Sequence, residues 1–84
     1  MLLTLDVVGR ILGQAIDDKS VVSGVSIDTR TLINGALFAA IRGTKVDGHD
    51  YLFTAMERGA CGAIVETVNP SVDLPQICVT NTVD

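Results

Sequence analysis

GALFAAIRGTKVDGHDYLFTAMERGACGAIVE, residues 35–66, contains two apolar runs separated by a polar loop and an amphipathic segment. The apolar runs at 37–41 and 62–66 predict buried strands. Residues 50–58 between them predict a short helix, with Gly59 at its C-terminal end. The side chains expected on the inward face of this helix are Leu52, Phe53 and Met56. Strand, helix and strand within about thirty residues form a βαβ unit, so the two strands are expected to be parallel with a right-handed crossover.

The residues before this unit predict a further helix and a further strand. The helix follows Thr4, a suitable N-cap residue, and ends at Gly13. Its apolar face consists of Leu5, Val8, Ile11 and Leu12. Within residues 21–28, Val25 and Ile27 alternate with polar neighbours, which predicts a half-buried strand.

A turn at Asn34–Gly35 leads into the βαβ unit, and residues 76–80 predict a last strand after it. The chain has 84 residues, of which 48% are hydrophobic but only 4% are aromatic, so its core must consist of Val, Ile, Leu and Ala. Residues 1–84 are expected to form one domain. The predicted fold class is α/β: a small mixed sheet with a βαβ unit and flanking helices.

The charge pattern argues against some partners and points to another. Ten acidic and six basic residues give a net charge of −4, which does not favour nucleic acid as a partner. No acidic residue lies between Thr29 and Val46, whereas Arg30, Arg42 and Lys45 all do. This distribution favours a site for a small anion, although chance clustering on a solvated face gives the same pattern.

Cys61 and Cys78 lie in apolar segments without metal-ligand spacing, so we expect reduced, largely buried thiols in a cytoplasmic protein. Two distant cysteines and the single His49 are too few for a zinc site. No apolar stretch approaches the roughly 20 residues that span a bilayer, so no membrane role is expected.

The loop at residues 42–49 is the strongest candidate for a binding site. Ligands of open α/β sheets bind beyond the carboxyl ends of the strands, often where a helix begins and exposes unpaired amides. Gly43 and Gly48 would let the backbone approach a ligand, and Lys45 could pair with a phosphate. An ordinary structural connector is the alternative. His49 could act as a base or could bind backbone at the helix start. No catalytic constellation and no phosphate-binding Gly-Lys-Ser/Thr sequence occurs.

Three segments, in this order and at these spacings, resemble the N-terminal domain of the Mur ligases. They are SIDTR at 26–30, GALFAA at 35–40 and RGTKVDGHD at 42–50. The family pattern is Asp-Ser/Thr-Arg, then Gly-x-Leu-Phe-x-Ala, then Gly-x-x-x-Asp-Gly-His before a helix that ends near Gly-Ala. Gly59–Ala60 and the strands at 63–66 and 74–79 continue the match, so the resemblance covers nearly the whole chain.

The resemblance implies a domain that binds the UDP part of a UDP-N-acetylmuramoyl-peptide for a cytoplasmic ligase of peptidoglycan biosynthesis. In the parent ligase, a central ATP-binding domain and a C-terminal domain would form an acyl phosphate and join an amino group to it. ATP and Mg²⁺ are thus expected cofactors of the parent ligase, with none in this domain. The expected partners are the UDP-N-acetylmuramoyl-peptide and those two domains. Residues 1–84 would be the substrate-binding domain alone, without catalytic residues.

Two types of ligase share this domain. The opening Leu3–Thr4–Leu5, the threonine at position 29 and the ending at 79–82 resemble the type that adds D-alanyl-D-alanine (MurF type). The loop at 43–49 resembles at least equally the type that adds the third amino acid (MurE type). We favour the MurF type. The alternatives are the MurE type and a non-catalytic sensor or binding domain like that of HPr kinases.

The family motifs imply eight substrate-binding positions. They are Ile27, Thr29, Arg30, Thr44, Lys45, Val46, Asp47 and His49. Ile27 and Thr29 would contact the nucleotide at the end of a strand, and residues 44–46 would enclose it from the loop. Arg30, Asp47 and His49 match the motifs as well but can shape the two loops instead of touching the ligand.

Overall fold

The structure is a computed structural model and describes residues 3–41 and 47–80. Its centre is a sheet of four short strands: β1 (Val25–Ser26), β2 (Leu37–Ala39), β3 (Gly62–Val65) and β4 (Gln76–Cys78). The strands lie in the order β1-β2-β3-β4, and each neighbouring pair is parallel. The sheet is therefore parallel throughout and not mixed as expected. Antiparallel pairing in the described residues is confined to an isolated bridge between Thr4 and Val21, outside these strands.

The predicted βαβ unit is confirmed, and with it the α/β fold class. Phe38 of β2 pairs with Ala63 of β3 in a parallel register. The connection between these strands contains a 3₁₀ turn, η1 (Gly48–Tyr51), which continues into α2 (Leu52–Glu57). Gly59 ends the helix with a φ of 90°, a conformation that favours glycine.

Alternate residues of the strands pack against opposite faces of the sheet. Phe38 and Ala63 contact the side chains of α2, where Leu52 and Ala55 are fully buried. Leu37, one residue before Phe38, faces the other way. Full burial of a side chain such as Leu52 contributes about 1.5–3 kcal/mol to folding.

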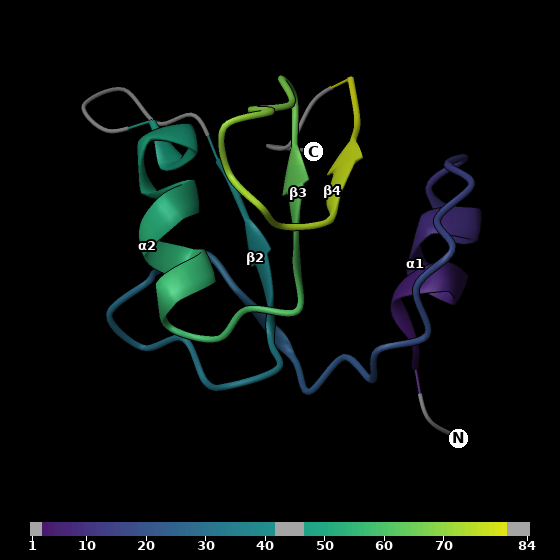
Figure 1. The fold of residues 1–84 in the computed structure, drawn as a ribbon, viewed down its shortest axis with the longest axis horizontal. Coiled ribbons are helices and arrows are strands. Elements are labelled where there is room, and N and C mark those ends of the chain that lie inside the picture. Colours follow the sequence, from purple (N-terminus) through teal and green to yellow (C-terminus); the bar gives the residue numbers. More distant parts are fainter. Residues whose placement is uncertain (1–2, 42–46, 81–84) are drawn as a thin grey trace.

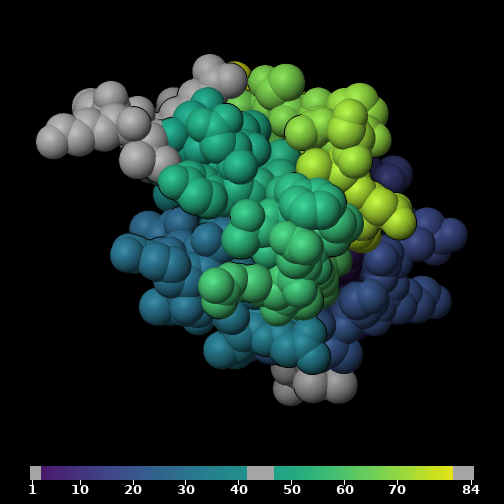
Figure 2. Space-filling view, turned by 60° about the vertical axis from the view of Figure 1, so that its left-hand side comes forward, coloured from purple at the N-terminus to yellow at the C-terminus, as the bar shows by residue number. Residues whose placement is uncertain are grey.

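The opposite face of the sheet is covered by the N-terminal segment. Leu5 and Val8 of α1 (Leu5–Ile11) pack with Leu37 and Ile77. Figure 1 shows the two helices on opposite sides of the sheet, with α1 nearest to β4. Figure 2 shows the surface of α2, teal to green, between the blue segment that precedes β2 and the yellow-green loop that follows β3.

Several side chains lie differently from the prediction. Thr4 is the N-cap residue of α1 as predicted, but its side chain accepts no bond from the helix. Its hydroxyl instead donates to the carboxylate of Asp6, which accepts from Val7 N–H at 2.9 Å. Ile11 and Leu12 are exposed because only the first part of the short helix reaches the sheet. Phe53 was expected to point inward, but 54% of it is exposed.

The alternation in the first strand also has the opposite sense. Val25 and Ile27 are 65% and 66% exposed, whereas Ser26 is half-buried. β1 is an edge strand of two residues, so its neighbours cover only part of its surface. Cys61 and Cys78 are free thiols as expected, but both are half-buried and not fully enclosed. No helix in the described part of the chain is long and apolar enough to cross a membrane.

Candidate functional site

A pocket of about 470 Å³ lies where β1 and β2 end. Because the strands are parallel, the segments that follow them emerge at the same edge of the sheet. Residues 27–30 follow β1, Ile41 follows β2, and η1 supplies the facing wall. The lining residues are Ile27, Asp28, Thr29, Arg30, Phe38, Ile41, Gly48 and Tyr51.

The hydroxyl of Thr29 is available to a ligand in this pocket. Thr29 is only 7% exposed, and the structure gives its hydroxyl no hydrogen-bond partner among the described residues. Thr29 is one of the residues that line the pocket, and no side-chain oxygen or nitrogen in the described part of the chain is both fully enclosed and unpaired. A buried polar group ordinarily has a partner. Thr29 thus offers a pre-positioned donor and acceptor to an incoming molecule.

Asp28 and Arg30 form a closed ion pair at the rim of the pocket. Arg30 Nη2 lies 2.9 Å from Asp28 Oδ2, and the backbone N–H of Arg30 donates to Asp28 Oδ1 at 2.9 Å. The guanidinium and this N–H both hold the pKa of the Asp28 carboxyl below its ordinary value. The same contact raises the pKa of Arg30. The pair leaves this part of the rim close to neutral.

The remaining walls are largely apolar. Ile27 and Tyr51 are both substantially exposed at the mouth, whereas Phe38 is buried beneath them. Large apolar side chains at a mouth are typical of sites that bury the flat face of a ligand, with a few polar groups for orientation. The described part of the pocket is therefore suited to bind and orient a molecule, and it contains no nucleophile paired with a base.

The segment that closes the loop is held by its own hydrogen bonds. Gly48 N–H donates to the carbonyl of Ile41 at 2.8 Å, and His49 N–H donates to Asp47 Oδ1 at 2.9 Å. Asp50 N–H donates to the carbonyl of Asp47 at 3.0 Å. The amides at the helix start were expected to be free for a ligand. This expectation is wrong for these three, which the protein itself occupies.

The pocket brings together only part of the predicted site. Ile27, Thr29 and Arg30 line it. Asp47 and His49 are not among its lining residues, and the ring of His49 reaches the backbone N–H of Glu66 at 3.0 Å instead. The predicted contacts Thr44, Lys45 and Val46 lie outside the described residues.

Sequence reasoning missed four residues that line the pocket: Asp28, Phe38, Ile41 and Tyr51. Tyr51 could have been found, because it is the only tyrosine and it lies at the start of the helix that follows the candidate loop. Phe38 and Ile41 carried no such signal, since their apolar side chains equally suit a strand of the core.

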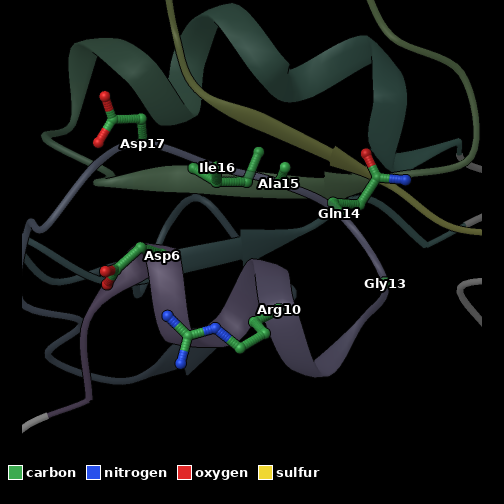
Figure 3. Close-up of a pocket in the computed structure, with 7 residues that line it drawn as sticks. All are labelled: Asp6, Arg10, Gly13, Gln14, Ala15, Ile16 and Asp17. Carbon is green, nitrogen blue, oxygen red and sulfur yellow. The ribbon is translucent and has the colours of Figure 1, made fainter.

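A second cavity, of about 560 Å³, lies between α1 and the segment that follows it. Figure 3 shows Asp6 and Arg10 on the helix and Asp17 on the facing segment. None of the predicted site residues lines this cavity. The described residues also contain no group of three or more His, Cys, Asp or Glu side chains placed to hold a metal ion. The pocket at the ends of β1 and β2 is therefore the better candidate.

Comparison with known proteins identifies the family. Residues 21–82 match the model of the Mur ligase family, catalytic domain. The chain is 36% identical over 66 residues to the UDP-N-acetylmuramoyl-tripeptide–D-alanyl-D-alanine ligase of Haemophilus influenzae, covering 79% of this chain and 14% of that protein. It is 45% identical over 49 residues to the UDP-N-acetylmuramoyl-L-alanyl-D-glutamate–2,6-diaminopimelate ligase of Chlorobium phaeobacteroides, covering 58% of this chain and 10% of that one.

Solved structures of related ligases share the fold. MurF from Acinetobacter baumannii superposes with a TM-score of 0.71 at 25% identity, over 82% of this chain and 15% of that chain. MurF ligase from Thermotoga maritima, in complex with ADP, gives a TM-score of 0.64 at 28% identity, over 71% of this chain and 14% of that one. The chain therefore spans only about a seventh of the length of these proteins.

Proposed function

Because this chain belongs to the Mur ligase family, we propose that it binds the UDP part of a UDP-N-acetylmuramoyl-peptide in the pocket at the ends of β1 and β2. Relatives of both the MurF and the MurE type carry such a substrate in their names. The family match supports this role over the alternative of a sensor domain like that of HPr kinases. It also supports a role in peptidoglycan biosynthesis.

The observation that carries this proposal is the buried Thr29, whose hydroxyl has no partner among the described residues, beside the apolar walls of the pocket. A planar uracil ring would pack against Ile27 and Tyr51, and Thr29 would bond one of its polar edges. The Asp28–Arg30 pair stands at the rim and shapes the turn that presents Thr29.

The diphosphate requires positive charge, and the described pocket supplies little. Two further basic residues, Arg42 and Lys45, lie in the sequence between the lining residues Ile41 and Gly48, in the stretch without acidic residues. We propose that Thr44, Lys45 and Val46 enclose the nucleotide from this side. Ile41 and Gly48, which stand on either side of residues 42–47 in the sequence, both line the pocket. Asp47 and His49 would act by shaping the segment.

The chain would be the substrate-binding domain of a larger cytoplasmic ligase. We propose that ATP and Mg²⁺ are bound by the parts of the ligase that its longer relatives carry beyond this span; the solved MurF ligase from Thermotoga maritima is a complex with ADP. On its own the chain would bind substrate without catalysis. The partners of the domain would be the substrate and those further domains.

The MurF type is favoured as the parent, with addition of D-alanyl-D-alanine as its reaction. Solved MurF ligases share the fold at 25% and 28% identity, and a MurF-type ligase is 36% identical over 66 residues. A MurE-type relative is 45% identical over 49 residues, so addition of the third amino acid is the second candidate. Assay of the full-length ligase with D-alanyl-D-alanine and with diaminopimelate or lysine distinguishes the two.

NMR titration of the ¹⁵N-labelled chain with UDP-N-acetylmuramic acid tests the binding proposal. Shifts are expected at the amides of Ile27 and Thr29 and at the ring of Tyr51, which is easily assigned as the only tyrosine. Thr29→Val removes the hydroxyl at nearly constant volume and should weaken binding. Thr31→Val is the matched control, because Thr31 is exposed and does not line the pocket. Its hydroxyl donates only one long bond, of 3.4 Å, to the backbone carbonyl of Asp28.

Shifts confined to the cavity beside α1 would show that the pocket is wrongly assigned. Equal binding of ADP and UDP would contradict recognition of uracil by Thr29. If millimolar ligand produced no shifts at all, the same two variants in the full-length ligase would decide. There Thr29→Val should raise the Michaelis constant for the nucleotide substrate and leave that for ATP unchanged.

A further inference from the structure

Both ring nitrogens of His49 are engaged by neighbouring groups. Nδ1 lies 2.7 Å from Asp47 Oδ1. Nε2 accepts from the backbone N–H of Glu66 at 3.0 Å and lies 3.4 Å from that of Thr67. Only 12% of the His49 side chain is exposed, so water competes little for these contacts.

These partners fix where the proton of the ring must be. A backbone N–H can only donate, so Nε2 must keep its lone pair to accept from Glu66. The carboxylate of Asp47 can only accept, so Nδ1 must carry the hydrogen. From this geometry we infer that His49 is held as the neutral Nδ1–H tautomer and is a positioning residue for the wall of the pocket that contains Tyr51.

The route from His49 to the pocket is short. His49 is the second residue of η1, whose first and last residues, Gly48 and Tyr51, both line the pocket. The bond from Gly48 to Ile41 ties η1 to the end of β2, and the bond from Glu66 to His49 ties it to the end of β3. The Gly48 backbone and the His49 ring together thus tie η1 to the ends of two adjacent strands. That the pocket binds UDP rests on the proposed function; the tautomer and the position of η1 do not.

This arrangement also assigns His49 a role other than proton transfer. Its only basic nitrogen accepts from the N–H of Glu66, and His49 is not among the residues that line the pocket. A second proton, on Nε2, would place N–H against N–H and break the link to β3.

The ring can be observed without ambiguity because the chain has one histidine. Two-bond ¹H–¹⁵N correlation of the wild-type chain at neutral pH should give a protonated-type Nδ1 and an unprotonated-type Nε2. A dominant Nε2–H tautomer, or the fast-exchange average of a free imidazole, would overturn the inference. This readout needs no ligand, so it is independent of UDP binding.

Two substitutions separate the two ring contacts. In His49→Asn the side-chain amide can still donate to Asp47 but is too short to reach Glu66. In His49→Gln the terminal oxygen can take the place of Nε2 and accept from Glu66. We expect His49→Asn to shift the Gly48 amide and the Tyr51 ring and to weaken UDP-N-acetylmuramic acid binding on the order of fivefold. His49→Gln should restore both toward wild type.

The tautomer readout on the wild-type chain keeps the inference testable if the variants do not fold. Tyr51 ring signals and a Gly48 amide that are unchanged in a folded His49→Asn variant would overturn the positioning role. If the Tyr51 ring shifts as expected in His49→Asn but the chain does not bind UDP-N-acetylmuramic acid, only the proposed function would be overturned.

Discussion

Gly48 lies against the end of β2 so closely that a Cβ atom there would be 2.6 Å from the backbone nitrogen of Ile41. Its N–H meanwhile donates to the carbonyl of the same residue at 2.8 Å. The two backbones are therefore in direct contact, and this contact seats η1 beside the pocket. Its φ is not in the left-handed region, so the requirement for glycine here is one of space.

Gly48→Ala should destabilise the chain by about 1–3 kcal/mol, because the added methyl overlaps backbone that cannot move aside. Gly24→Ala is the matched control, since a Cβ at Gly24 would meet nothing within 4 Å. Urea unfolding followed by circular dichroism measures both. A Gly48→Ala variant as stable as Gly24→Ala would contradict the close contact.

The pKa of Asp28 should be lower than that of an ordinary aspartate, chiefly because the Arg30 guanidinium donates to it. Carboxyl ¹³C titration should show this, and Arg30→Gln should raise the midpoint toward the ordinary value. Arg58→Gln is a suitable control, because Arg58 is the weakest of the groups that lower this pKa. Equal effects of the two variants would argue against the Asp28–Arg30 pair.

The sign of the linked stability follows. A carboxyl whose pKa is lowered by folding stabilises the fold above its unfolded pKa of about 3.9 and loses that contribution as pH falls through the folded value. Arg30→Gln should therefore reduce stability at neutral pH and leave it nearly unchanged at pH 2. Because both side chains are exposed, added salt should diminish the difference.

Leu52 and Phe53 test which face of α2 is buried. Leu52→Ala should cost about 2–5 kcal/mol, because Leu52 is 1% exposed and its truncation leaves a cavity under the sheet. Phe53→Ala should cost about 1 kcal/mol, since more than half of that residue already faces water. The inverse order, read from denaturation midpoints, would favour the sequence-based prediction that Phe53 points inward.

The thiol of Cys61 should react slowly at neutral pH. Burial raises its pKa, so less of it is present as the reactive thiolate. In a Cys78→Ser variant, which isolates Cys61, iodoacetamide should label the folded chain several-fold more slowly than the urea-unfolded chain. Equal labelling rates in the folded and unfolded states would show that the Cys61 thiol is more accessible than in the structure.

The sequence predicted those elements whose signal is local. The βαβ unit followed from two apolar runs and a helix between them, and Gly59 followed from the need for a left-handed residue at the helix end. The facing of side chains was less predictable. Alternation with a period of two indicates that Val25 and Ile27 lie on the same side of the chain, but it does not indicate whether other residues cover that side. β1 is an edge strand of two residues, and the described residues leave both side chains mostly exposed.

The pocket was predictable only in part for a related reason. Thr29 and Ile27 were found because a motif marks them. The wall that faces them depends on where η1 is seated, and this depends on contacts between His49 and Glu66, which are 17 residues apart. No local pattern encodes such a pairing.

The order of the strands has a consequence for how the chain assembles. Val25 pairs with Leu37, twelve residues later, and Ala63 pairs with Gln76, thirteen residues later, whereas Leu37 and Gly62 are twenty-five residues apart. Closing a loop of twice the length costs only about 0.6 kcal/mol more. Each strand can thus join the edge left by the one before it, in the order of synthesis and without a distant partner. Such short separations are typical of chains that fold fast for an all-parallel sheet. In kinetic experiments, substitutions at the junction of β2 and β3 should therefore slow folding most, because this pairing joins two halves that can each form early.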